Sequence, residues 1–198
     1  PKLQMRSSKY QTDKMVLVTT INFDQTVEIG DPISQAKIFN AQSADELVFL
    51  DLDASKDNRN TLIQIIKEAA KQIFIPLTVG GGVRSVSDFR VLLSNGADKI
   101  CMNTAAVNNP DFINEASKNF GSSTVVVSID YKIMNGRYSV WINGGKEQTN
   151  LEPVEWAVEC EKRGAGEILL CSIDKDGTKA GLDLEITERT SKAISIPV

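Results

Sequence analysis

The feature that most constrains this chain is an internal repeat with an offset of 121 residues. Residues 44–53 (ADELVFLDLD) are matched by residues 165–174 (AGEILLCSID), and the same offset places residues 75–77 onto residues 196–198. A repeat this long indicates a duplicated half-domain, because the repeats of solenoid proteins are much shorter. In the first copy the tripeptide leads into the glycine turn TVGGG at residues 78–82, whereas the second copy ends before that turn.

Short apolar runs alternate with amphipathic segments along the whole chain. The short runs are almost continuously apolar, which is typical of parallel strands covered by helices on both faces. An alternation of this kind implies parallel strands joined by right-handed crossovers. The predicted strands are residues 46–52, 75–79, 99–102, 124–129 and 167–172, and the predicted helices are residues 32–42, 59–72, 85–94, 111–119, 153–163 and 184–194.

Two regions depart from this alternation. Residues 6–14 are polar and rich in turn-forming side chains, and they separate the apolar runs at residues 2–5 and 15–21. Residues 132–149 contain two runs around the turn sequences NG and GG, which predicts a hairpin-like excursion after the strand at 124–129. Because no linker or change of composition interrupts the chain, we predict one domain over residues 1–198.

Two α/β architectures are compatible with the alternation, an open doubly wound sheet and a (β/α)8 barrel. An open sheet usually carries a glycine fingerprint after its first strand, and this chain has none there. Two copies of a (β/α)4 unit close into a ring of eight strands, so the repeat favours the (β/α)8 TIM barrel. With about six strands and the start of a seventh, we expect the barrel to be C-terminally truncated, with a gap in its wall.

Composition excludes several classes of function. The net charge of -4 offers no basic face for nucleic acid, and no apolar run approaches the roughly 20 residues of a membrane span. The three cysteines have no paired spacing that would indicate a zinc site or a disulfide framework. The chain has no histidine, which leaves acid–base chemistry to carboxylates, lysine or tyrosine. We therefore expect a cytoplasmic enzyme with no metal and no cofactor.

In a barrel of this type the functional site lies on the loops at the carboxyl ends of the strands. Carboxylates recur at these ends, although a purely structural protein would have no evident reason to place them there. Because a buried unpaired carboxylate is costly, we expect these groups to lie in a cleft or to have partners. The residues at the strand ends are Asp51, Asp53, Gly80, Gly81, Gly82, Asn103, Thr104, Asp130, Asp174, Asp176, Gly177 and Thr178.

The glycine turn at residues 80–82 indicates a phosphate site, since amides without a neighbouring Cβ can approach an anion and the next helix adds its positive end. The alternative is a flexible turn. Asn103 and Thr104 end the adjacent strand, so we expect them to converge with Gly82 on one phosphate. Asp176, Gly177 and Thr178 would begin a second anion site across the ring, which implies a substrate with a phosphate at each end.

Asp130 ends an apolar strand, where burial would raise its pKa toward the working range of an acid–base catalyst. The alternative is a structural aspartate that binds loop amides. At the other end of the strands, Glu46, Lys99 and Glu167 stand at or near strand starts. They would form a ring of charge there, or else ordinary salt bridges at the rim.

Together these motifs resemble the cyclase subunit of imidazole glycerol phosphate synthase, a histidine-biosynthesis family. The resemblance covers residues 15–198 and depends on the combination of motifs rather than on any one of them. The motifs are GDP at 30–32, DEL at 45–47 with Asp51, TVGGG at 78–82, NTAA at 103–106, ID at 129–130, GAGEILL at 164–170 and SIDKDGT at 172–178.

The resemblance implies a lyase built on a barrel of two half-barrels. Such a cyclase receives ammonia from a partner glutaminase, with which it forms a heterodimer. It converts a bis-phosphorylated ribulosyl formimino-carboxamide ribotide to imidazole glycerol phosphate and an aminoimidazole carboxamide ribotide.

The same resemblance implies a role for each candidate residue. Asp130 is similar to one of two catalytic carboxylates. Three residues at or near the starts of strands resemble the gate through which ammonia enters, and five others resemble the two phosphate sites. The gate residues are Glu46, Lys99 and Glu167, and the phosphate residues are Gly82, Asn103 and Thr104 for one site and Asp176 and Gly177 for the other.

The chain departs from the family pattern near its start. The second catalytic aspartate of the family would fall on Gln4, or on Gln11 if the polar segment is aligned without a gap. Neither side chain can shuttle a proton. A lysine of the family pattern would fall on Thr19, and the gate arginine would precede Pro1.

These departures leave a second function open. The chain also resembles a paralogous branch associated with surface-sugar amidation, in which the barrel delivers ammonia to another enzyme. An unrelated phosphosugar isomerase or aldolase on the same fold is a third alternative, because fold does not fix function.

Overall fold

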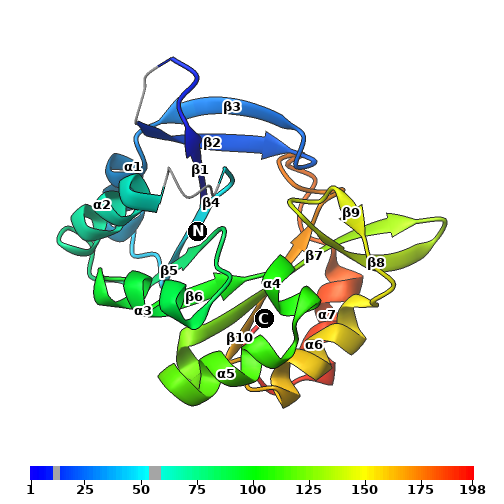
Figure 1. Ribbon diagram of the computed structural model, residues 1–198. Coiled ribbons are helices and arrows are strands. Elements are labelled where there is room, and N and C mark those ends of the chain that lie inside the picture. Colours follow the sequence, from blue (N-terminus) through cyan, green and yellow to red (C-terminus); the bar gives the residue numbers. More distant parts are fainter. Residues whose placement is uncertain (11–13, 54–58) are drawn as a thin grey trace. The chain divides into compact units, whose positions relative to one another are not determined.

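The computed structural model describes residues 1–10, 14–53 and 59–198, which form two compact α/β units. The first unit comprises Pro1–Thr19 and Thr26–Cys101, and the second comprises Thr20–Gln25 and Met102–Val198. Figure 1 labels the elements of both.

The first unit is built on a sheet with the strand order β3-β2-β1-β4-β5-β6. Its parallel part is β1, β4, β5 and β6, and β2 pairs antiparallel with β1. The helices α1, α2 and α3 lie on one side of strands β4 and β5 (Figure 1), and α1 packs on α2. The strands are β1 (Lys2–Ser7), β2 (Met15–Ile21), β3 (Gln25–Gly30), β4 (Leu47–Asp51), β5 (Leu77–Gly80) and β6 (Lys99–Met102), and the helices are α1 (Pro32–Ala41), α2 (Arg59–Ala70) and α3 (Val86–Ser94).

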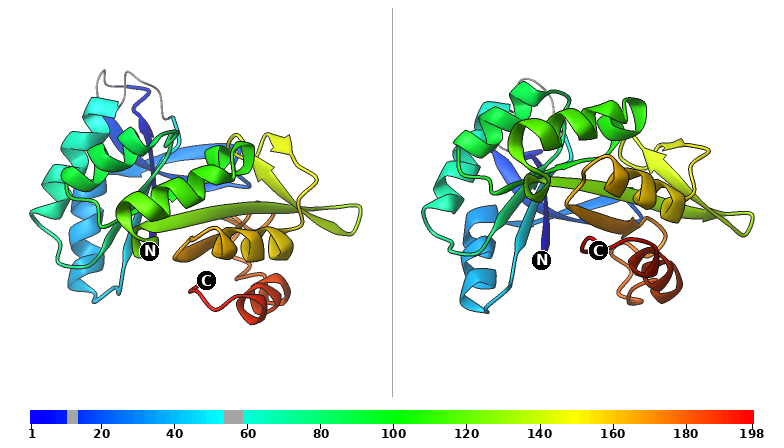
Figure 2. Two further views of the ribbon diagram at one scale, coloured as in Figure 1. Left: turned by 60° about the horizontal axis from the view of Figure 1, so that its bottom comes forward. Right: turned by 90° about the horizontal axis from the view of Figure 1, so that it is seen from below.

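The second unit is organised around the long strand β7. Strand β10 pairs parallel with β7, while β8 pairs antiparallel with it and continues the sheet to β9. Helices α5 and α6 pack on β7, and α7 lies beside α6, as Figure 2 shows. The elements are α4 (Thr104–Asn108), α5 (Asp111–Phe120), the 3-10 helix η1 (Ser122–Thr124), β7 (Val125–Met134), β8 (Arg137–Ile142), β9 (Glu147–Gln148), α6 (Pro153–Lys162), β10 (Glu167–Ser172) and α7 (Leu184–Ala193).

The helix starts follow local sequence signals. Pro32 opens α1 with its fixed φ, and the Asp31 carboxylate accepts a hydrogen bond from the Ser34 amide at 2.7 Å. Pro153 opens α6 in the same way after the capping side chain of Glu152. These caps satisfy amides that have no partner inside the helix, so the boundaries are set by a few side chains.

The internal repeat recurs in the hydrogen bonding of the two units. The Leu47 amide donates to the Pro76 carbonyl at 2.9 Å, and the Ile168 amide donates to the Pro197 carbonyl at the same distance. Each pair is displaced from the other by the offset of 121 residues found in the sequence. Each unit also has an antiparallel hairpin on its first parallel strand, β1–β2 in one and β7–β8 in the other. The two halves are therefore copies of one structural plan.

The predicted parallel strands and long helices are confirmed, with differences at their ends. The largest difference is in β7, which was expected to end at Ile129 and continues to Met134 because its last residues pair with β8. This extension also confirms the hairpin predicted over residues 132–149. The sequence patterns missed the short or polar elements β3, β9, η1 and α4.

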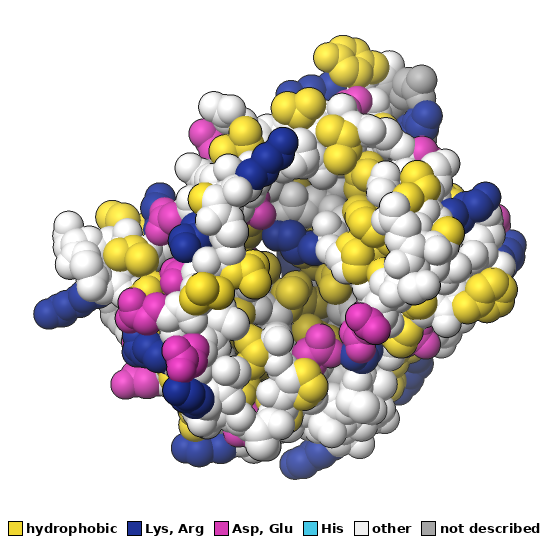
Figure 3. Space-filling model, turned by 180° about the vertical axis from the view of Figure 1, so that it is seen from behind, with side chains coloured by type: hydrophobic (Ala, Val, Ile, Leu, Met, Phe, Trp, Pro, Cys, Tyr) yellow, Lys and Arg dark blue, Asp and Glu magenta, His cyan; other side chains and the backbone are white. Residues whose placement is uncertain are grey.

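The exposed charges are mixed in sign. On the face of the molecule in Figure 3, Lys and Arg side chains are interspersed with Asp and Glu side chains. None of the helices in the described parts of the chain is both long and apolar enough to cross a membrane.

Candidate active site

Asp130 lies within β7, at the point where the hairpin with β8 begins. It is half-buried, opposite Trp141 of β8 in the pairing register. The Asn103 side-chain amide donates to Asp130 Oδ2 at 2.7 Å, and the Ser128 hydroxyl donates to Oδ1 at 3.0 Å. Both carboxylate oxygens thus have a fixed donor, which holds the group in one orientation.

The carboxamide of Asn103 is oriented by these contacts. Its nitrogen donates to Asp130 and, at 3.4 Å, to the Trp141 carbonyl. Its buried oxygen Oδ1 accepts no hydrogen bond from the residues that the structure describes. The next residue, Thr104, accepts a hydrogen bond at its hydroxyl from the Asn143 amide at 3.0 Å. The Asn103–Asp130 hydrogen bond was not predicted from the sequence. The role of Asn103 and Thr104 in phosphate binding stays a prediction.

The glycine turn after β5 is required by close packing. A Cβ on Gly81, whose φ is +106°, would lie 2.3 Å from the Asp51 carbonyl oxygen, and one on Gly80 would lie 2.7 Å from Leu50. Gly82 also has a positive φ, of 61°. A side chain at Gly80 or Gly81 would displace these neighbours, and the positive φ of Gly82 favours glycine there as well. Gly82 belongs to the first unit and Asn103 to the second, so their convergence on one phosphate stays a prediction.

The expectation that the following helix adds its positive end to this turn needs correction. Helix α3 begins at Val86, and its first turn is capped by its own side chains. The Ser85 hydroxyl accepts from the Asp88 amide at 3.2 Å, and the Asp88 carboxylate accepts from the Arg84 amide at 2.9 Å. This arrangement places a negative charge at the helix start, so an anion at the glycine turn would depend on the loop amides.

The second predicted anion site lies in the loop between β10 and α7. Asp176 is half-buried there and accepts hydrogen bonds from the Thr20 hydroxyl at Oδ2 and from the Asn22 amide at its carbonyl, the latter at 3.0 Å. Gly177 has a φ of +70°, and a Cβ on it would lie 1.9 Å from the Thr20 carbonyl oxygen. Among the described residues, none accepts a hydrogen bond from the Gly177 amide. That amide can serve as an anion donor, as predicted for this turn.

Three other carboxylates at strand ends have structural tasks, which corrects the expectation that a structural role would not place them there. Asp51 is buried and accepts from the Asp53 amide at 3.0 Å. Asp53 accepts from the Ser7 amide at 3.2 Å, and Asp174 accepts from the Ile133 amide at 2.9 Å. The last two contacts occupy equivalent places in the two halves, where each carboxylate binds a main-chain amide at the end of a strand.

Two of the three charged residues at the strand starts form an ion pair within the first unit. Lys99 Nζ lies 2.7 Å from Glu46 Oε1 in the first unit, with 19% and 38% of the two side chains exposed. Glu167 begins β10 in the second unit. The Glu46–Lys99 ion pair is an observation, and the three-residue gate stays a prediction.

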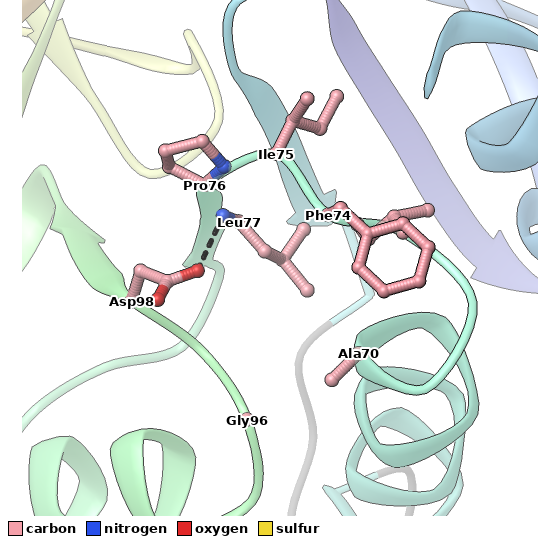
Figure 4. Close-up of a pocket in the computed structure, with 8 residues that line it drawn as sticks. Ala70, Phe74, Ile75, Pro76, Leu77, Gly96 and Asp98 are labelled. Carbon is pink, nitrogen blue, oxygen red and sulfur yellow. Dashed lines mark hydrogen bonds between the residues drawn. The ribbon is translucent and has the colours of Figure 1, made fainter. Parts of the chain in front are cut away.

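A pocket of about 300 Å³ lies near this ion pair, at the amino end of β5. Figure 4 shows it between the end of α2 and the loop at Gly96, with the Leu77 amide bonded to Asp98 Oδ2 at 2.8 Å. Phe74 is 91% exposed at its edge. None of the residues predicted for phosphate binding or catalysis lines it.

The structure also identifies the counterpart of Asp130 in the first half. The repeat offset relates Leu50 to Cys171, and these residues occupy equivalent positions in the parallel pairs of the two units. Leu50 pairs with Gln4, whereas Cys171 pairs with Asp130. Gln4, which is 7% exposed, is thus the equivalent of Asp130, and the alternative Gln11 lies outside the described residues.

Tyr131, the neighbour of Asp130, is unsuited to be the general base. Its phenol is buried, and burial together with the nearby charge of Asp183 raises its pKa above the ordinary value. The phenol therefore stays protonated near neutral pH. Within the described ranges, no three carboxylate or thiol side chains are grouped to hold a metal ion.

Comparisons with known proteins agree with the motif pattern. A model of the family described as "Histidine biosynthesis protein" matches residues 11–198. The chain is 49% identical over 183 residues to a protein of Alkaliphilus metalliredigens (strain QYMF) named imidazole glycerol phosphate synthase subunit HisF, and the match covers 92% of this chain and 73% of that protein. The resemblance drawn from the sequence motifs is confirmed by both comparisons, and the chain belongs to the histidine biosynthesis protein family.

Proposed function

We propose that this chain catalyses the ammonia-dependent cyclisation step of histidine biosynthesis. The substrate would be a bis-phosphorylated ribulosyl formimino-carboxamide ribotide, cleaved to imidazole glycerol phosphate and an aminoimidazole carboxamide ribotide. The observation that carries this proposal is the Asp130 cluster, found in a chain that is 49% identical to a HisF subunit over most of its length.

Asp130 is the proposed acid–base catalyst. The donors on its two oxygens fix the plane of the carboxylate, so that a proton can be exchanged in a constant direction. Asn103 donates through its nitrogen, which leaves its oxygen as an acceptor for an N–H or O–H group. This pairing suits a substrate and a reagent that both carry nitrogen-bound protons.

The two phosphates of the substrate would bind to main-chain amides of the two halves. The positive φ values at Gly82 and Gly177 turn the backbone into conformations that allow close approach of an anion. The repeated hydrogen bonds of the two halves support the further proposal that the fold is a barrel of two half-barrels, since duplicated halves place equivalent loops at equivalent strand ends.

A glutaminase is the proposed partner, docked at the amino ends of the strands. The Glu46–Lys99 ion pair lies at that end of the first unit, and Glu167 begins a strand of the second. The exposed Phe74 at the edge of the nearby pocket supports a protein contact, because aromatic side chains are enriched at interfaces. Ammonia released by the partner would enter past the ion pair.

Gln4 favours the second candidate function, delivery of ammonia to a sugar-amidating enzyme. It occupies the place in the first half that Asp130 occupies in the second, and it is buried. An amide there cannot take part in proton transfer, whereas a chain that only passes ammonia onward does not need a second acid.

An ammonia-dependent cyclisation assay on the full chain separates the two functions. We expect turnover of the ribotide in ammonium salts, and a loss of at least about 100-fold in Asp130→Asn, which is the scale of acid–base catalysis. Asp111→Asn, an exposed aspartate at the start of α5, is the matched control and should keep its rate. Absence of turnover in the unaltered chain, combined with binding of the glutaminase, would exclude the cyclase and favour the ammonia-delivery function.

A further inference from the structure

The segment Thr20–Gln25, which joins β2 to β3, packs on the loop that carries Asp176. We call this segment the Thr20 turn. It belongs to the second unit, although the strands on either side of it belong mainly to the first.

Three contacts join the Thr20 turn to the Asp176 loop. The Thr20 hydroxyl donates to Asp176 Oδ2, and the Asn22 amide donates to the Asp176 carbonyl at 3.0 Å. The Thr20 carbonyl fits against Gly177 so closely that a Cβ there would overlap it. Side chain, main chain and packing all fix the same pair of residues, Asp176 and Gly177.

The conformation of the Thr20 turn is itself costly. Asn22 and Phe23 have φ values of 52° and 60°, and the Asp24 amide closes the turn on the Ile21 carbonyl at 3.0 Å. A bulky residue such as Phe23 rarely adopts a positive φ. Such a conformation is stable only where contacts with the surrounding structure offset its cost. Gly145, after β8, provides one such contact, because a Cβ there would lie 3.1 Å from the Phe23 ring.

We infer that Thr20 is a positioning residue, which orients the Asp176 carboxylate and the Gly177 amide for substrate. Thr20 is 4% exposed, so the hydrogen bond from its hydroxyl to Asp176 is shielded from competing water. A hydrogen bond to a charged carboxylate is stronger than one between neutral groups, so the contact is suited to fix orientation. The expected effect of this residue on KM rests on the proposed cyclase function. Its expected effect on the conformation of the Asp176 loop rests on the contacts alone.

The test compares Thr20→Val, which removes the hydroxyl but keeps the shape, with Thr20→Ser, which keeps the hydroxyl. We expect Thr20→Val to raise the KM for the ribotide about tenfold with a smaller change in kcat, and Thr20→Ser to stay near the unaltered chain. Thr190→Val is the control, because Thr190 is fully buried in the same unit and its hydroxyl bonds to Ile186 of its own helix. It should leave KM unchanged.

A second measurement does not depend on cyclase activity. In NMR spectra we expect faster hydrogen exchange at the Asn22 amide in Thr20→Val, and a weaker shift of the Gly177 amide when inorganic phosphate is added. Thr190→Val should change neither signal. If the unaltered chain has no cyclase turnover but these signals respond, the proposed function fails and the positioning role stands.

Two results would overturn the inference. One is an unaltered chain that turns over substrate while Thr20→Val matches Thr190→Val in KM and in Asn22 exchange. The other is faster Asn22 exchange in Thr20→Val with KM and the phosphate response of Gly177 both unchanged, which would make the contact structural only.

Discussion

The contact between Gly177 and the Thr20 carbonyl predicts a large difference between two glycine substitutions in one loop. Gly177 and Gly181 both have a positive φ, of 70° and 84°. A Cβ on Gly177 would lie 1.9 Å from the Thr20 oxygen, whereas one on Gly181 would meet no atom within 4 Å. Both substitutions to alanine therefore have the same backbone penalty, about 1–2 kcal/mol for a left-handed conformation. Only Gly177→Ala also places a methyl group in overlap with the Thr20 carbonyl oxygen.

The overlap sets the additional loss. Real Cβ contacts below 3.0 Å are essentially unknown, so the methyl group must move the Thr20 carbonyl by about 1 Å or more. A shift of that size breaks the two hydrogen bonds that Thr20 and Asn22 donate to Asp176. At about 1 kcal/mol each, their loss makes Gly177→Ala less stable than Gly181→Ala by about 2 kcal/mol.

Urea denaturation followed by tryptophan fluorescence measures this difference. We expect a lower midpoint for Gly177→Ala than for Gly181→Ala at equal m-values, which would assign the change to stability rather than to compactness. In a chain that also carries Thr20→Val, the difference in stability between Gly177→Ala and Gly181→Ala should be smaller. The hydrogen bond from Thr20 to Asp176 is then already absent, so Gly177→Ala can break only the bond from Asn22. Equal free energies of unfolding for the two alanine variants would refute the packing of the Thr20 turn on Gly177.

Three further results are expected. Lys99→Met should lower the free energy of unfolding in urea by no more than about 1 kcal/mol, because its ion pair with Glu46 is partly exposed; a loss of several kcal/mol would contradict this account. Burial raises the pKa of the Cys160 thiol, so peptide mapping should find it unlabelled by iodoacetamide at pH 8 in the folded chain. Because the folded state holds that proton more tightly, the free energy of unfolding should fall above about pH 8.5, and a rise would contradict the assignment. Gln4→Asp should increase ammonia-dependent turnover while Gln4→Asn does not, and equal rates would remove Gln4 as the position of the missing acid.

The sequence predicted those parts of the fold that depend on buried apolar surface. Continuous apolar runs identified β6 and β10 with their observed limits, and Ser85 identified the cap of α3. Strand β3 was missed because its residues are mostly exposed, so its sequence carries no burial pattern. Helix α4 was missed because its five residues are too few for a helical period to appear.

The candidate site could be predicted by residue type but not by partner. The sequence identified Asp130 and Asp176 as candidates, yet nothing in it indicated that Asn103 would bond to one and Thr20 to the other. Thr20 is 156 positions from its acceptor, and a hydroxyl at the end of an apolar strand has no distinguishing pattern. Long-range hydrogen bonds depend on how strands are paired, which a single sequence specifies only through the completed fold.

Comparison of the two halves separates structural carboxylates from chemical ones. Asp53 and Asp174 occupy equivalent positions and perform the same task, each accepting a hydrogen bond from a main-chain amide at a strand end. The hydrogen bond lies near the end of the first parallel strand in each half, and an aspartate accepts it in both. Gln4 and Asp130 are equivalent in the same register but differ in chemistry. A frame that needed a carboxylate at this position would need it in both halves, so the difference between Gln4 and Asp130 supports the proposal that the Asp130 carboxylate serves chemistry rather than the fold.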